Sequence, residues 1–119
     1  MSKYSFFLRV SSSALLALAS VTRVSAVCGT NAIGLANAPA GAVIVNNDCT
    51  TIDTKEIGDF NVCGEYEGDS QAVCRTPFTP STIHTLDGLD WGNCVASTEK
   101  CGTDDHTDQP NILWCCPAL

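Results

Sequence analysis

Short hydrophobic runs separated by turn-forming polar residues recur along the chain. Residues 43–45 (Val-Ile-Val) are β-branched and are followed by Asn-Asn-Asp at 46–48, which predicts a strand that ends in a turn. Residues 50–57 mix β-branched and charged side chains and predict a second strand. Residues 28–42 are rich in Gly, Asn and Pro, so we expect turns and extended chain there rather than a stable helix.

The clearest predicted hairpin spans residues 59–75. Side chains alternate between the two faces of a strand, so Phe60, Val62 and Tyr66 fall on one face of an extended chain. The sequence Glu-Gly-Asp-Ser at 67–70 supplies the turn, and the residues after it form the returning strand.

The remainder of the chain predicts an exposed loop and three further strands. The loop is the cluster of proline and hydroxyl residues at 76–82. The strands are residues 83–86, which are followed by an Asp-Gly turn signal, residues 93–96 and residues 112–116. Together these elements predict a small disulfide-rich, mainly β fold, either a compact antiparallel sheet or a barrel-like domain stapled by four disulfides.

The first 26 residues have the pattern of a secretory signal peptide. Lys3 and Arg9 precede an apolar stretch at 14–19, and Val-Ser-Ala at 24–26 fits the small-residue rule for signal peptidase. The apolar stretch is shorter than the roughly 20 residues of a membrane-spanning helix. We therefore expect a secreted, extracellular protein whose mature chain is a single disulfide-rich domain at 27–119, with no membrane insertion.

Removal of residues 1–26 makes the chain strongly acidic. Lys55, Arg75 and Lys100 remain against all 13 acidic residues, which gives a net charge of −10. Such a surface repels phosphate backbones and anionic lipid headgroups, so we expect no binding to nucleic acid. A basic partner or an uncharged polysaccharide fits this charge better.

The eight cysteines all lie in the mature part of the chain. An even number in an oxidising compartment predicts four disulfides, although the sequence does not choose among the possible pairings. In particular, Cys63 and Cys74 could close the predicted hairpin or bond to neighbouring strands. No C-x₂-C spacing suggests zinc. The eight positions are Cys28, Cys49, Cys63, Cys74, Cys94, Cys101, Cys115 and Cys116.

No catalytic or cofactor motif is recognisable. His84 and His106 are the two histidines, there is no G-x-S-x-G sequence, and eight paired cysteines leave no free thiol. The acidic residues around His106 at 104–108 could collect Ca²⁺, but they lack the spacing and terminal Glu of a calcium loop. We therefore predict a protein that is not an enzyme and binds no metal or cofactor.

Two aromatic residues are candidates for ligand binding. Trp91 lies beside Asp90 and Asn93, and together with Tyr66 it could form a platform on which a sugar stacks. In so small a protein, however, aromatic residues are more often part of the core. We expect Trp114, next to the cysteine pair, to be core.

In overall architecture the chain resembles the small secreted cysteine-rich proteins of filamentous fungi. The resemblance rests on the signal peptide ending in Val-Ser-Ala, the short mature chain, the eight cysteines ending in Cys115-Cys116 and the lack of a catalytic motif. That class contains effectors and elicitors that act at a host surface. The resemblance implies a non-enzymatic, effector-like protein that binds a host or cell-wall component in the extracellular space.

Two other functions remain open at this point. One is inhibition of secreted proteases by a loop at 76–82 or 87–91 that flanking disulfides hold rigid. The other is binding of cell-wall glycans through Tyr66 and Trp91. A homodimer is also possible, because a β protein of this size can expose a sheet edge.

Overall fold

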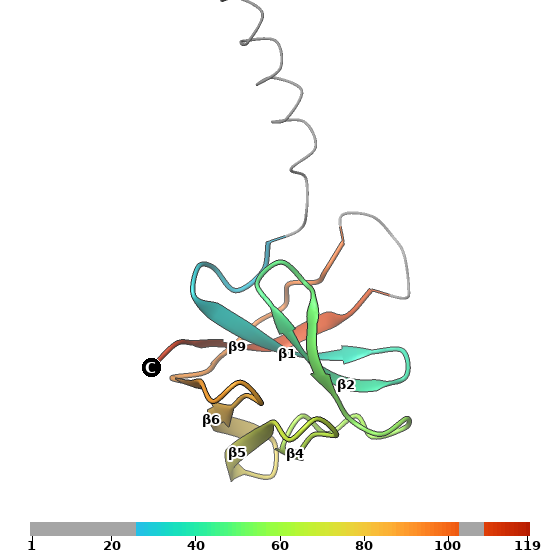
Figure 1. Cartoon of the computed structure of the whole chain (residues 1–119). Coiled ribbons are helices and arrows are strands. Elements are labelled where there is room, and N and C mark those ends of the chain that lie inside the picture. The colour runs from blue at the N-terminus through green and yellow to red at the C-terminus, as the bar shows by residue number, and fades with distance from the viewer. Residues whose placement is uncertain (1–25, 103–108) are drawn as a thin grey trace, which may run out of the picture.

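The computed structural model describes residues 26–102 and 109–119, and in them the chain forms two antiparallel β-sheets. The central sheet has the strand order β3-β2-β1-β9-β8, and the small sheet has the order β4-β5-β6-β7. Figure 1 shows β4, β5 and β6 on one side of β1, β2 and β9. The strands are β1 (Ala32–Ala38), β2 (Gly41–Asn46), β3 (Thr51–Thr54), β4 (Gly64–Glu65), β5 (Gln71–Thr76), β6 (Thr79–His84), β7 (Asp90–Gly92), β8 (Val95–Ala96) and β9 (Asn111–Pro117).

This architecture confirms the expected all-β, disulfide-rich fold. Of the two forms that the sequence allowed, the described residues adopt packed sheets and do not close into a barrel. The predicted signal peptide at 1–26 lies outside the described residues except for Ala26. Within the described part of the chain, no helix is both long and apolar enough to cross a membrane.

Several predicted strands are present, with shorter bounds in some cases. Residues 43–45 lie within β2 and residues 112–116 lie within β9. The strand expected at 50–57 is limited to β3, and the one expected at 93–96 is limited to β8.

The centre of the larger sheet is β1, in a region where the sequence predicted only turns and extended chain. β1 pairs with β2 on one side and with β9 on the other. Its sequence is Ala-Ile-Gly-Leu-Ala-Asn-Ala, and small residues are required because both of its faces are covered. A Cβ on Gly34 would lie only 3.2 Å from Ile112 Cδ1 and 3.3 Å from Cys28 Sγ. Close packing against a disulfide therefore explains a strand that lacks a β-branched run.

The predicted hairpin at 59–75 forms, but its first strand is short. β4 contributes only Gly64–Glu65 to the pairing with β5, and the turn between them is closed by a hydrogen bond from Tyr66 N to Ser70 O of 2.8 Å. Val62 and Tyr66 are buried as expected, whereas the Phe60 side chain is 47% exposed. Phe60 precedes the paired region, so strand alternation does not decide where it points.

The prediction of an exposed loop at 76–82 was wrong. β5 ends at Thr76 and β6 begins at Thr79, so only Pro77 and Phe78 form the turn. Proline disfavours a strand because it cannot donate to the ladder. Pro80 is accommodated opposite Cys74, where the register between β5 and β6 shifts. A β-bulge thus allows this proline-rich segment to pair.

Two hydrophobic cores cover the two faces of the central sheet. The inner core lies between the sheets and includes Ile33, Leu35 and Ile44 from the central sheet and Ala72 and Ile83 from the small sheet. The outer core covers the opposite face and includes the side chains that alternate with these, among them Val43, Val45, Ile112 and Cys115, with Val27 and Cys101 packed on them.

The cysteine pair at 115 and 116 connects to both cores. Adjacent side chains in a strand point to opposite faces. Cys115 therefore bonds to Cys28 in the outer core, and Cys116 bonds to Cys94 at the edge of the inner core. The other disulfides are Cys49–Cys101 and Cys63–Cys74, and no cysteine is free. Four disulfides indicate an oxidising environment, as expected for an extracellular protein.

Candidate functional site

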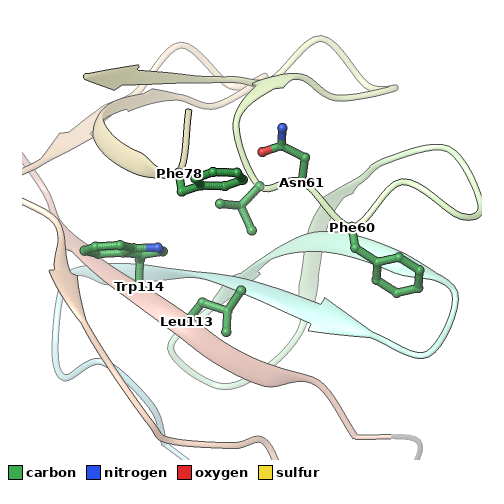
Figure 2. A pocket seen from close by; sticks show the side chains of 6 residues that line it. Phe60, Asn61, Phe78, Leu113 and Trp114 are labelled. Carbon is green, nitrogen blue, oxygen red and sulfur yellow. The ribbon is translucent and has the colours of Figure 1, made fainter. Parts of the chain in front are cut away.

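An apolar cleft of about 500 Å³ opens between the two sheets. It is lined by residues from three separate parts of the chain, and Figure 2 shows Phe78 and Trp114 on facing sides of it. Three of the five aromatic residues in 27–119 line this cleft. The lining residues are Phe60, Asn61, Val62, Phe78, Leu113 and Trp114.

A β-bulge in β9 forms the wall that belongs to the central sheet. Leu35 pairs with Trp114 and the next residue, Ala36, pairs with Ile112, so Leu113 is an extra residue without a partner in β1. Neighbouring side chains in a regular strand would point to opposite faces. The bulge instead allows both Leu113 and Trp114 to face the cleft, and both pack against the inner core (Figure 2).

The opposite wall is the turn between β5 and β6. Pro77 and Phe78 are the only residues between these strands, and the Phe78 side chain is 75% exposed. A single exposed apolar residue needs no explanation in a folded protein. Here, however, Phe78, Phe60 and Trp114 gather around one hollow.

Residues 60–62 complete the cleft and are held by side-chain hydrogen bonds rather than by a sheet. Asp59 Oδ1 accepts a hydrogen bond from Asn61 N at 3.0 Å, and Asn61 Oδ1 accepts one from Cys63 N at 2.9 Å. Such contacts between Asp or Asn and the backbone two residues later are typical of turns. They fix the orientation of the Asn61 side chain, whose amide nitrogen points away from Leu113 and Trp114 in Figure 2.

Lys55 binds both ends of the same segment, at Asp59 and at Cys63. Its ammonium group donates to Cys63 O at 2.6 Å, lies 3.5 Å from Asp59 Oδ2 and stands 5.1 Å above the centre of the Tyr66 ring. The Lys55 side chain is almost fully buried, so its charge is compensated by these contacts rather than by water. No charged side chain lines the cleft.

Disulfides lie close to every wall of the cleft. Cys63 directly follows residues 60–62, Cys74 lies in the strand that leads to Phe78, and Cys115 follows Trp114. The bond between Cys63 and Cys74 ties the segment that carries Phe60 to the hairpin that carries Phe78. We therefore expect the cleft to lose its shape when the disulfides are reduced.

A buried carboxylate links the two sheets. Asp53 of β3 accepts hydrogen bonds from Gly68 N at 2.7 Å and from Ser70 N at 3.0 Å, in the turn between β4 and β5. Burial acts to raise the pKa of Asp53, but the hydrogen bonds from Ser70, Gly68 and Thr54 outweigh it and hold the pKa below its usual value.

The structure does not place Tyr66 and Trp91 together as an exposed pair. Only 5% of Tyr66 is exposed, and its hydroxyl donates to Val62 O at 2.7 Å. Burial, with smaller effects from Asp59 and Asp53, raises the pKa of this hydroxyl. Trp91 is half-buried against the inner core, and its Nε1 donates to Thr85 Oγ1 at 3.1 Å.

The segments considered as inhibitory loops are tight turns. Residues 77–78 form the short turn described above, and residues 85–89 close on themselves through a hydrogen bond from Thr85 N to Leu89 O at 3.0 Å. The Thr85 hydroxyl lies 2.6 Å from Asp87 Oδ1, and this hydrogen bond holds the pKa of Asp87 below its usual value.

No group of three or more potential metal ligands occurs among residues 26–102 and 109–119. The acidic segment considered for Ca²⁺, at 104–108, lies outside the described residues. His84 lies on β6, and its Nδ1 is 2.6 Å from Asp90 Oδ1. The side chains of His84 and Asp90 are each about half exposed.

Comparison with known proteins finds no matching family model, no similar curated protein and no similar solved structure. The chain is a small cysteine-rich, disulfide-stapled β protein.

Sequence reasoning did not find the cleft. It assigned Trp114 to the core, placed Phe78 in a loop and used Phe60 only as a strand residue. The turn-forming side chains of Asp59 and Asn61, two positions apart, were the one local signal of an irregular segment.

Proposed function

We propose that this chain is a secreted, non-enzymatic, effector- or elicitor-like protein that acts at a host or cell-wall surface by binding through the inter-sheet cleft. The observation that carries the proposal is the gathering of Phe60, Phe78 and Trp114 around an open hollow. Removing apolar surface from water is favourable, so a ligand that covers these side chains would gain free energy on binding. A concave apolar site of this kind is a common form of ligand site.

The four disulfides support a role outside the cell. A small domain with this framework resists unfolding in an oxidising and protease-rich environment, because the cross-links restrict the unfolded chain. Glycan binding through Tyr66 loses support because Tyr66 is buried, and the inhibitory loop considered at 76–82 is reduced to the two residues of a turn.

The proposal is tested by infiltrating the oxidised protein, residues 27–119, into plant leaves and scoring defence responses and cell death. A reduced and alkylated sample tests whether the folded form is needed. Phe78→Ser tests the cleft, and Ile57→Ser is the matched control, because Ile57 is 85% exposed and does not line the cleft.

We expect a response to the oxidised protein and to Ile57→Ser, and a much weaker one to Phe78→Ser and to the reduced form. Equal responses to all four samples would contradict recognition of the folded cleft. Silence from all of them would favour a protein that suppresses host responses, and assays of protease inhibition and glycan binding would then come first.

A further inference from the structure

We infer that the cleft takes an uncharged, largely apolar small molecule with a ring system, held between Phe78 and Trp114. The inference rests on the proposed function in so far as it takes the cleft to be the binding site. It goes further by naming the chemical class of the ligand.

The size of the cleft fits a small molecule. Its volume of about 500 Å³ lies within the range of roughly 300–1,000 Å³ that is common for ligand pockets. The walls come from β9, from the turn between β5 and β6 and from residues 60–62, so a ligand would contact both sheets. Phe78 and Trp114 both line this space, with Phe78 above Trp114 in Figure 2, which suits a flat ring that can contact aromatic side chains.

The lining argues against a sugar. Five of the six lining side chains are largely apolar, and the polar groups among the six are the Asn61 amide and the indole Nε1 of Trp114. Asn61 Oδ1 already accepts a hydrogen bond from Cys63 N, and its Nδ2 points away from Leu113 and Trp114 in Figure 2, so Asn61 offers little to the many hydroxyl groups of a sugar. A sugar ring carries hydroxyl groups along its edges, and each one that loses water without a new partner costs free energy. An apolar ligand with a single acceptor avoids that cost.

Charge argues against an ion. No lysine, arginine or histidine lines the cleft, and the mature chain has a net charge of −10, so a buried anion would have no partner. A cation would need a carboxylate. Asp59, next to the lining residues, already contacts Lys55 Nζ and accepts from Asn61 N.

Two dyes with the same ring skeleton test the inference. N-phenyl-1-naphthylamine is uncharged, and 8-anilino-1-naphthalenesulfonate adds a sulfonate to that skeleton. The oxidised protein is used with Trp91→Phe, so that Trp114 is the only tryptophan and its fluorescence reports on the cleft. Chitohexaose and cellohexaose are the sugar probes.

We expect saturable quenching of Trp114 by the neutral dye, at least about tenfold weaker binding of the sulfonate, and no effect of either sugar. Phe78→Ser and Phe60→Ser, one from each of two walls, should each weaken binding of the neutral dye by about tenfold. Ile57→Ser should leave it unchanged. Thermal unfolding of each variant checks that it is folded, and having two cleft variants keeps the test valid if one is not.

Four results would overturn the inference: no saturable binding of the neutral dye, equal or tighter binding of the sulfonate, displacement of the neutral dye by a sugar, or unchanged affinity in both cleft variants. The leaf assay separates this failure from failure of the proposed function. A host response that needs Phe78, without dye binding, would overturn the ligand class alone. Selective dye binding without any host response would support the ligand class and contradict an elicitor that the host perceives.

Discussion

In the central sheet, β1 and β2 each bury five consecutive residues, whereas in β5 of the small sheet only Ala72 is buried and Cys74 partly buried, with exposed residues on either side of each. The central sheet is covered on both faces by hydrophobic cores. The small sheet contributes one face to the inner core and leaves the other to solvent. Strands with two covered faces need continuous apolar or small residues, while strands with one need only alternation.

The two sheets also differ in the cross-links and hydrogen bonds that stabilise them. The central sheet is tied by disulfides that join distant parts of the chain, such as Cys28–Cys115 with a separation of 87 residues. The small sheet has one local disulfide, Cys63–Cys74, with a separation of 11, and relies on polar side chains such as Asp53 and Thr85. Burial and long-range cross-links thus stabilise one sheet. Side-chain hydrogen bonds, including those to Asp53 of the central sheet, shape the turns of the other, whose hairpin carries Phe78 to the cleft.

The largest expected effect is that complete reduction unfolds both sheets. Each disulfide contributes roughly 2–4 kcal/mol, and together they are comparable with the roughly 5–15 kcal/mol of a typical domain. Circular dichroism in excess reductant should show loss of the β signal, after mass spectrometry confirms eight free thiols. An unchanged spectrum would show that the cores suffice without cross-links.

Removal of single disulfides should distinguish the sheets. The loop-entropy estimate gives about 4–5 kcal/mol for Cys28–Cys115 and about 3 kcal/mol for Cys63–Cys74, because the first closes a longer loop. Urea unfolding of the two double cysteine-to-alanine variants measures this difference. A larger loss from the local disulfide would contradict the view that long-range cross-links stabilise mainly the central sheet.

Truncation of one apolar side chain in each sheet compares burial directly. Leu35 is fully buried in β1, so Leu35→Ala should destabilise the protein by roughly 2–5 kcal/mol through lost contacts and a cavity. Val73 of β5 is 40% exposed, and Val73→Ala should cost less than about 1 kcal/mol. Equal losses in urea unfolding would remove the distinction between the sheets.

Asp53→Asn should weaken the contact between β3 and the turn of the small sheet by about 1–3 kcal/mol, since an amide cannot accept at both oxygen positions. The pKa of Asp53 is lower in the folded state than in the unfolded chain. Its stabilisation is therefore present at pH 7 and is lost as the pH falls from about 5 through the folded-state pKa.

Urea unfolding at pH 7 and pH 3 should accordingly show a smaller gap between wild type and Asp53→Asn at the lower pH. Asp69→Asn is the control, because Asp69 lies in the same turn but is exposed. A gap that stays constant with pH would mean that ionisation of Asp53 contributes nothing to stability.

The smallest expected effect on stability is that of Phe78→Ser. Phe78 is 75% exposed at the tip of its turn, so the change in unfolding free energy should be within about 0.5 kcal/mol. Urea unfolding beside Ile57→Ser measures it. A loss above about 2 kcal/mol would mean that Phe78 is part of the fold, and not a side chain available to a ligand.

The elements that could be predicted are those with a strong local signal. The β-branched run in β2 and the turn at 67–70 formed as expected, because both depend on residues that are neighbours in sequence. β1 was missed because its small residues are explained only by packing against Ile112 and Cys28. The loop predicted at 76–82 was wrong because a bulge, which is a property of strand pairing, accommodates Pro80.

The candidate site was less predictable than the fold. Trp114 follows Leu113 in the chain, and strand alternation predicts that the two point to opposite faces. The bulge against Leu35 and Ala36 removes that alternation. Phe60 and Phe78 join them from other segments, and no local pattern indicates that these side chains share one cleft.

By itself, the sequence determined that the chain is a mainly β domain with four disulfides and a strongly acidic surface. These properties follow from residue type and local spacing. Tertiary structure alone decided which cysteines pair, that Cys115 and Cys116 serve opposite faces of one sheet, and that aromatic residues from three segments meet in a cleft. The physical reason is that pairing and clefts depend on which strands become neighbours, and contacts between distant residues set that arrangement.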